Sequence, residues 1–169
     1  MYPDFKELLS ILNEHHVKYL VVGAYAVGVH AQPRATKDLD ILVKADGDNA
    51  KAVYAALAKF GAPLEGLTAA DFSEAGPFFR MGRAPVGVDV LTKIPGIEFD
   101  TAWQRRVESV IDPATRLKVN FISADDLIAS KLASGRLQDL ADADAIRKAA
   151  ESQWPEAKKK PAGPSGPKQ

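Results

Sequence analysis

The sequence predicts an α+β (mixed α/β) domain in which helices cover mainly one face of a small mixed β-sheet. Three observations support this prediction. Strand-like apolar runs alternate with helical patterns over residues 1–60, strand patterns follow one another over residues 78–121, and helical patterns come last. We expect one domain over residues 1–152, closed by C-terminal helices, and a disordered tail rich in Pro, Gly and Lys over residues 153–169.

The first half of the chain predicts helix, strand, helix, strand and helix in that order. Phe5, Leu8, Leu9 and Leu12 recur at helical spacing, which is typical of an amphipathic helix. Residues 19–22 form a continuous apolar run, as expected of a buried strand. The predicted helices are 3–15, 24–31 and 50–60, and the predicted strands are 19–22 and 38–43.

The second half predicts a loop, four strands and three helices. Residues 61–77 are dense in Gly, Pro and polar residues, which predicts a loop with one short helix. Ser123 precedes two acids, a pattern typical of a capped helix start. The predicted strands are 78–81, 86–92, 107–111 and 117–121, and the predicted helices are 98–106, one from 124 and one from about 137 to 150.

Composition excludes several classes of function. Lys plus Arg and Asp plus Glu both number 22, so a net charge of +0 attracts no nucleic acid as a whole, and any such partner needs a local basic patch. The absence of cysteine excludes disulfides, thiol catalysis and thiolate metal sites. No apolar run approaches the roughly 20 residues of a membrane span, and the N-terminus lacks a signal-peptide core, so we expect a cytoplasmic protein.

Asp38 and Asp40 are the first candidate site residues. On a strand both side chains point to one face, about 6–7 Å apart along the backbone. Neighbouring carboxylates raise each other's pKa, and a hard cation removes that cost. Ligands that are oxygen only select Mg²⁺ or Mn²⁺. Alternatively, the pair lies on the solvated face of an edge strand, in ion pairs with Arg34 or Lys37.

Gly23 and Ala24 follow the first predicted strand. Their backbone N–H groups would open the next helix and face an anion, which makes a phosphate cradle. Alternatively, Gly23 only makes a tight turn. Arg34 and Lys37, just before the acidic pair, either bind polyphosphate or balance Asp38.

Asp89 is a carboxylate in the middle of a predicted strand. Such a position is unfavourable unless the side chain has a partner. Either Asp89 joins the first two carboxylates, or it is a structural residue paired with Arg80 or Arg83 across the hairpin. Asp46 and Asp48 repeat the spacing of the first pair around Gly47, and we interpret them as turn and capping residues.

Two stretches carry a resemblance to a known family. Val22-Gly23-Ala24, the spacer Tyr25 to Lys37, and Asp38-Leu39-Asp40, with Val88-Asp89-Val90 downstream, resemble the nucleotidyltransferase superfamily that includes DNA polymerase β. Arg34-Ala35-Thr36-Lys37-Asp38, and then Asp126-Leu127, Lys131, Arg136 and Asp139, resemble its AbiEii-like and minimal members. Ala24 departs from the usual Gly or Ser and can offer only its backbone N–H.

The resemblance implies a nucleotidyltransferase-like fold and a metal-dependent enzyme that moves a nucleoside monophosphate from a nucleoside triphosphate to a hydroxyl of RNA or protein. The implied catalytic and metal-binding residues, for Mg²⁺ or Mn²⁺, are Asp38, Asp40 and Asp89. The implied nucleotide-binding residues are Gly23, Ala24, Arg34, Lys37, Lys131 and Asp139.

Relatives of this kind include abortive-infection and toxin–antitoxin proteins, which implies a partner protein encoded nearby. The alternative is a catalytically inactive binding or antitoxin-like module, which Ala24 favours, whereas the intact set of three carboxylates favours the enzyme. A third possibility is a nucleotidyltransferase that modifies a sugar or a drug, for which the sequence shows no acceptor pocket signature. Lys131 also fits a snorkelling lysine. We interpret Asp142 as an acid near a helix start, outside the site.

Overall fold

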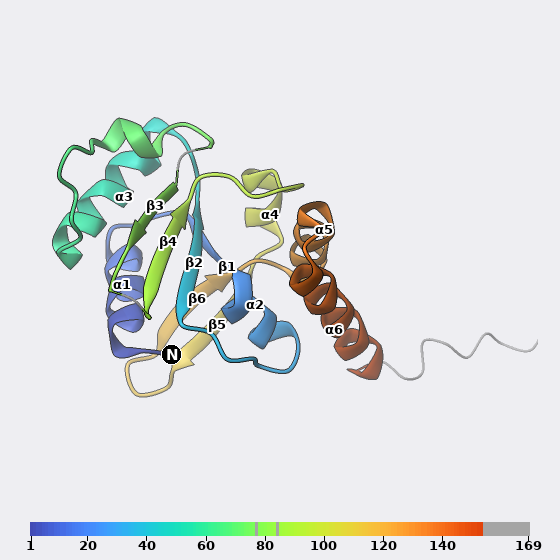
Figure 1. The fold of residues 1–169 in the computed structure, drawn as a ribbon. Coiled ribbons are helices and arrows are strands. Elements are labelled where there is room, and N and C mark those ends of the chain that lie inside the picture. Colours follow the sequence, from blue (N-terminus) through green and yellow to red (C-terminus); the bar gives the residue numbers. More distant parts are fainter. Residues whose placement is uncertain (77, 84, 154–169) are drawn as a thin grey trace, which may run out of the picture.

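The computed structural model describes residues 1–76, 78–83 and 85–153, and these form an α+β fold around one mixed sheet (Figure 1). Within them, the sheet has six strands in the order β3-β4-β2-β1-β6-β5. Its β1–β6 and β2–β4 pairs are parallel, and the other pairs are antiparallel. The strands are β1 (Tyr19–Val22), β2 (Asp38–Val43), β3 (Phe78–Met81), β4 (Gly87–Leu91), β5 (Val107–Asp112) and β6 (Leu117–Phe121). The predicted fold class is confirmed.

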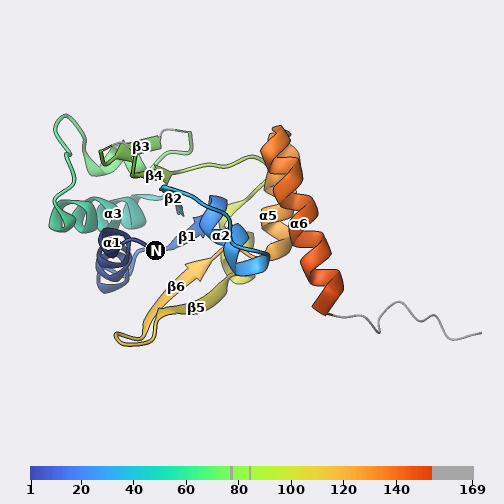
Figure 2. The same cartoon turned by 60° about the horizontal axis from the view of Figure 1, so that its bottom comes forward.

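The helices lie close to their predicted positions. Figure 2 shows the pair α5 and α6 at one end of the molecule and α1 with α3 at the other. The helices are α1 (Pro3–Glu14), α2 (Gly23–His30), α3 (Gly47–Phe60), the 3-10 helix η1 (Ala69–Phe72), α4 (Phe99–Gln104), α5 (Ala124–Ser134) and α6 (Leu137–Gln153). None of them is long and apolar enough to cross a membrane.

Local capping explains where two of these helices begin. Helix α3 starts at Gly47, three residues earlier than predicted, because the Asp46 carboxylate accepts the Asn49 N–H at 2.7 Å. Ser123 accepts the Asp126 N–H at 3.2 Å and caps α5, as predicted. The predicted disordered tail, 153–169, lies outside the described residues except for Gln153, the last residue of α6.

Burial differs between the two faces of β2. All four residues of β1 are buried, and in β2 Leu39 and Ile41 are buried while Asp38 and Asp40 are only half-buried. Because β2 lies between β4 and β1, the edge-strand alternative for Asp38 and Asp40 is wrong.

Strand register then sets the neighbours of Asp40. In the parallel β2–β4 pair, Asp40 lies directly opposite Asp89. In the antiparallel β1–β2 pair, Asp40 lies opposite Val22, the residue before Gly23. The end of β1, the middle of β2 and the middle of β4 therefore meet at one place.

Candidate functional site

The three carboxylates lie on one face of two neighbouring strands. Asp38 shares a face of β2 with Asp40, and Asp89 stands opposite Asp40 on β4. Arg80 of β3 lies opposite Asp89 and donates to its Oδ2 at 3.2 Å and to Asp38 Oδ2 at 3.4 Å. The pairing of Asp89 with Arg80, the structural alternative, is thus present, and the same guanidinium also reaches Asp38.

Arg80 leaves part of this acidic cluster uncompensated. Asp38 Oδ1 and Asp89 Oδ1 are buried and have no hydrogen-bond partner among the described residues. A buried carboxylate oxygen without a partner costs free energy, more than a neutral group in the same position. One guanidinium on a half-exposed side chain therefore does not satisfy three acids.

The pKa of Asp40 reflects this excess of negative charge. Burial, together with the negative charges of Asp89 and Asp38, raises the pKa of Asp40 to about 6. The positive charges of Lys131 and Arg80 oppose it without cancelling it. A cation placed among the carboxylates would favour the ionised form of Asp40 and lower its pKa again.

Gly23 touches the carboxylate of Asp40. Its φ of +65° lies in the left-handed region, and a Cβ built at Gly23 would stand 2.0 Å from Asp40 Oδ2. No side chain fits there, so glycine is required by contact as well as by backbone conformation. The bend is therefore more than a tight turn, because it brings the first turn of α2 against the acidic cluster.

Two cavities meet at Asp40. The first, which we name the polar lobe, has a volume of about 320 Å³ and is bordered by Gly23, Ala24, Arg34, Thr36, Asp38, Asp40, Lys131, Arg136, Gln138 and Asp139. The second, the apolar lobe, has a volume of about 380 Å³. It is bordered by Val22, Gly23, Asp40, Phe78, Arg80, Asp89, Leu91, Ile94, Pro95, Leu127, Ser130, Lys131, Ser134, Arg136 and Asp139.

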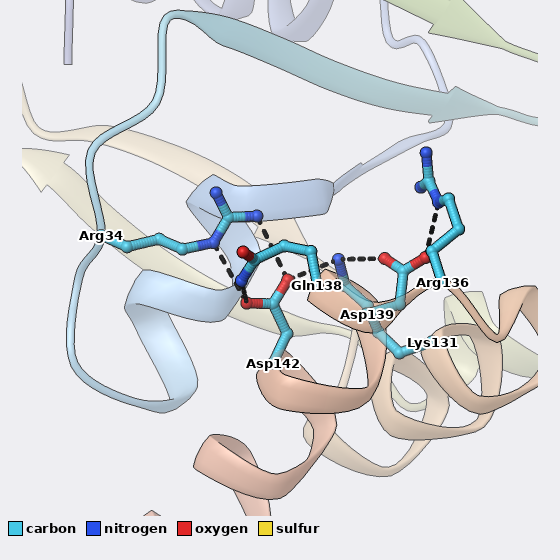
Figure 3. A network of polar contacts seen from close by, with 6 residues as sticks. All are labelled: Arg34, Lys131, Arg136, Gln138, Asp139 and Asp142. Atoms are coloured by element: carbon cyan, nitrogen blue, oxygen red, sulfur yellow. Dashed lines mark hydrogen bonds and ion pairs between the residues drawn. The ribbon is translucent and has the colours of Figure 1, made fainter.

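A buried ionic network forms the helical wall of the polar lobe (Figure 3). Lys131 Nζ of α5 donates to Asp139 Oδ1 at 3.1 Å and to Asp142 Oδ2 at 2.9 Å, both on α6. Arg34, from the loop before β2, holds Asp142 through two hydrogen bonds of 3.1 Å. The network thus fastens that loop to the C-terminal helices.

The other members complete the network. Arg136 donates to Asp139 Oδ2 at 2.7 Å, and Gln138 donates to Asp142 Oδ1 at 3.0 Å. Burial raises the pKa of Asp139, but hydrogen bonds, led by that from Arg136, outweigh burial and bring the pKa to about 2. Asp139 is therefore an anion at any physiological pH.

These contacts correct three expectations. Asp142 is 3% exposed, lies beyond the first turn of α6 and binds Lys131, so its interpretation as an acid near a helix start is wrong, although it borders neither lobe. Lys131 is buried between two acids and does not snorkel. Arg34 pairs with Asp142 and not with Asp38.

Lys37 has no such position. Its side chain is exposed and borders neither lobe. Within the described part of the chain, its backbone carbonyl accepts the Gly87 N–H at 3.3 Å. The loop turns Arg34 towards α6 and leaves Lys37 outside. Sequence reasoning missed the bridging role of Arg80 and the bond from Gln138, although the hairpin position of Arg80 was a usable signal.

The donor chemistry fits a hard divalent cation, although the side chains are not arranged around one. No three His, Asp or Glu side chains within residues 1–76, 78–83 and 85–153 are grouped closely enough, as they stand, to hold a metal ion. Arg80 forms ion pairs with both Asp38 and Asp89. The available donors are all carboxylate oxygens, two of them buried without a partner, which is the donor type that Mg²⁺ and Mn²⁺ prefer.

Solved structures share this fold. A candidate nucleotidyltransferase from Thermotoga maritima superposes with a TM-score of 0.51 at 14% identity, over 88% of this chain and 91% of that one. An antigenic nucleotidyltransferase-like protein from Paracoccidioides brasiliensis gives a TM-score of 0.50 at 19% identity, over 85% of this chain and 72% of that one. At these identities the likeness concerns the fold.

Sequence comparison goes further. No curated protein matches the chain significantly. A family model described as "Nucleotidyltransferase of unknown function (DUF6036)" matches residues 4–160. The chain therefore belongs to this nucleotidyltransferase family.

Proposed function

We propose that this protein is a metal-dependent nucleotidyltransferase that moves a nucleoside monophosphate from a nucleoside triphosphate to a hydroxyl of RNA or protein. The observation that carries the proposal is the meeting of Asp38, Asp40 and Asp89 beside Gly23, with two buried carboxylate oxygens unpartnered. Carboxylates so placed destabilise one another, and a function that needs cations explains why the chain keeps them together.

Each part of the site has a role in this reaction. The acceptor oxygen forms a bond to the α-phosphorus while the bond from that phosphorus to pyrophosphate breaks, and Asp89 takes the hydroxyl proton. Mg²⁺ or Mn²⁺, held by Asp38, Asp40 and Asp89, would neutralise phosphate charge and make the hydroxyl more acidic. Pyrophosphate leaves with the electron pair of the broken bond.

The polar lobe fits the triphosphate. Its border includes the exposed guanidinium group of Arg136 and that of Arg34, together with the start of α2 at Gly23 and Ala24. Backbone N–H groups at a helix start and arginine forks are ordinary phosphate ligands. Lys131 contributes its charge from a fixed position, because Asp139 and Asp142 hold its ammonium group.

One set of observations favours a second candidate, a catalytically inactive binding or antitoxin-like module. Ala24 offers no hydroxyl to phosphate, and Arg80 already bridges Asp38 and Asp89. In an active enzyme, Arg80 must turn away from the carboxylates when a cation binds.

The resemblance to AbiEii-like proteins favours, for either candidate, a cytoplasmic toxin–antitoxin or abortive-infection component with a partner encoded nearby.

A transfer assay separates the two candidates. The protein is incubated with each α-labelled triphosphate, Mg²⁺ or Mn²⁺, and total RNA or total protein. We expect label to reach one acceptor pool with wild-type protein and with Asp48→Asn, an exposed acid of the α3 start, but not with Asp40→Asn. Metal-dependent triphosphate binding without any transfer would favour the inactive module, and no binding of any triphosphate would refute both the enzyme and the phosphate site.

A further inference from the structure

The apolar lobe contains an aromatic side chain that packing does not explain. Phe78, on the edge strand β3, is 66% exposed, and no ring contact to it is recorded among the described residues, whereas its neighbour Phe79 packs edge-on against Phe72. Phe78 and Arg80 are two residues apart and share a face. Apolar side chains of Leu91, Ile94, Pro95 and Leu127 border the same lobe.

The two lobes are not equivalent with respect to the carboxylates. Asp89 borders only the apolar lobe, Asp38 borders only the polar lobe, and Asp40 borders both. In an in-line displacement, the attacking oxygen and the leaving pyrophosphate lie on opposite sides of the phosphorus. If the phosphates occupy the polar lobe, the acceptor must approach from the apolar lobe, where Asp89 can take its proton once Arg80 has turned away.

We infer that the apolar lobe is the acceptor subsite and that Phe78 stacks the base of a nucleoside whose hydroxyl reaches Asp89. This inference rests on the proposed function and adds the class of acceptor. An exposed aromatic ring beside a half-exposed guanidinium is a typical platform for an unpaired base and its phosphate. The lobe volume of about 380 Å³ lies within the usual range for small-ligand pockets.

The geometry favours a nucleoside over a protein side chain. A serine or threonine acceptor would leave the ring of Phe78 and the apolar floor of Leu91 and Ile94 without a partner of comparable area. The guanidinium of Arg80 stands opposite Asp89 in the β3–β4 register, at the edge of the same lobe, where it can meet the phosphate that precedes a terminal nucleoside.

The test measures nucleoside binding directly. Adenosine, cytidine, guanosine, uridine and N-acetyltyrosinamide are titrated into wild-type protein, Phe78→Ala and Phe78→Trp by NMR. Val110→Ala, which trims an exposed apolar residue of the other edge strand, is the matched control. We expect at least one nucleoside to bind, about 10-fold weaker binding in Phe78→Ala, and recovery in Phe78→Trp. Triphosphate affinity and binding to the control variant should not change.

Several outcomes would overturn the inference. These are equal nucleoside affinity in wild type and Phe78→Ala, no nucleoside binding to wild type, or stronger binding of N-acetyltyrosinamide than of any nucleoside. Phe78→Leu, which keeps the apolar area without the ring, replaces Phe78→Ala if the latter does not fold. In the transfer assay, Phe78→Ala should raise the KM for RNA and leave that for triphosphate unchanged. Phe78-dependent nucleoside binding without any triphosphate binding would refute the proposed function and leave the stacking subsite standing.

Discussion

The two acidic clusters of this fold differ in how far their carboxylates are hydrogen-bonded. In the network of α5 and α6, Asp139 and Asp142 each receive hydrogen bonds from Lys131 and from further side chains. On the sheet, one guanidinium bonds two of the three carboxylates, two buried oxygens have no partner in the described part of the chain, and the pKa of Asp40 rises to about 6. The first arrangement satisfies its charges within the fold, whereas the second leaves charge unsatisfied and is the arrangement on which the proposed function rests.

The largest effect is expected in the satisfied network. Lys131→Met removes the shared cation and leaves two buried carboxylates short of a partner, so we expect a loss of about 3–5 kcal/mol in the free energy of unfolding. Urea denaturation measures this loss. Lys148→Met, which breaks an exposed ion pair with Asp144, is the control and should leave the midpoint nearly unchanged. Similar midpoints for both variants would show that the network does not hold the helices.

Gly23→Ala should disturb the sheet cluster next most. The added methyl group meets Asp40 at a left-handed backbone position, so we expect a loss of about 2–4 kcal/mol and weaker triphosphate binding. Gly66→Ala separates the two causes, because Gly66 has φ +78° and open space at its Cβ position. Equal losses for the two variants would mean that contact with Asp40 contributes nothing.

Asp40→Asn should stabilise the metal-free protein. The folded pKa of about 6 lies above the ordinary value of 3.8, so the folded state binds more protons and loses stability as pH rises from about 4 to about 6. After allowance for partial solvation, we expect removal of this charge to raise the free energy of unfolding by about 1–2 kcal/mol at pH 7. Denaturation in EDTA at pH 4 and pH 7 should show a smaller pH dependence in Asp40→Asn than in Asp48→Asn. An unchanged dependence would contradict the raised pKa.

Arg80→Gln should have the smallest effect on stability, about 0–1 kcal/mol, because the side chain is 56% exposed. Its effect on cation binding is expected to be larger, since the guanidinium competes for Asp38 and Asp89. Calorimetric titration should show tighter Mn²⁺ binding in Arg80→Gln than in wild type, with Arg83→Gln of the same hairpin unchanged. Weaker Mn²⁺ binding in Arg80→Gln would mean that the arginine supports the cation.

The same two regions show how much of the site can be predicted from the sequence. Alternation along a strand places Asp38 and Asp40 on one face without knowledge of the fold. That Asp89 stands opposite Asp40 depends on β4 pairing with β2 in parallel, which no local pattern specifies.

The helical network was harder to predict. The hydrogen bond between Arg34 and Asp142 joins residues 108 apart in the sequence. Helix α6 is polar along much of its length, so periodicity did not distinguish the buried Asp142 from the exposed Asp144. Arg34 and Lys37 have similar charge, and only the course of their loop separates the buried contact of one from the exposure of the other.

The most direct test of the central claim is equilibrium binding of Mn²⁺, with and without a non-hydrolysable triphosphate, to wild-type protein and to Asp38→Asn, Asp40→Asn, Asp89→Asn and Asp48→Asn. The account predicts that triphosphate strengthens Mn²⁺ binding to wild type and to Asp48→Asn, and that each of the three sheet variants loses this binding. Equal Mn²⁺ binding by wild type and Asp40→Asn, or no Mn²⁺ binding by wild type with triphosphate present, would contradict it.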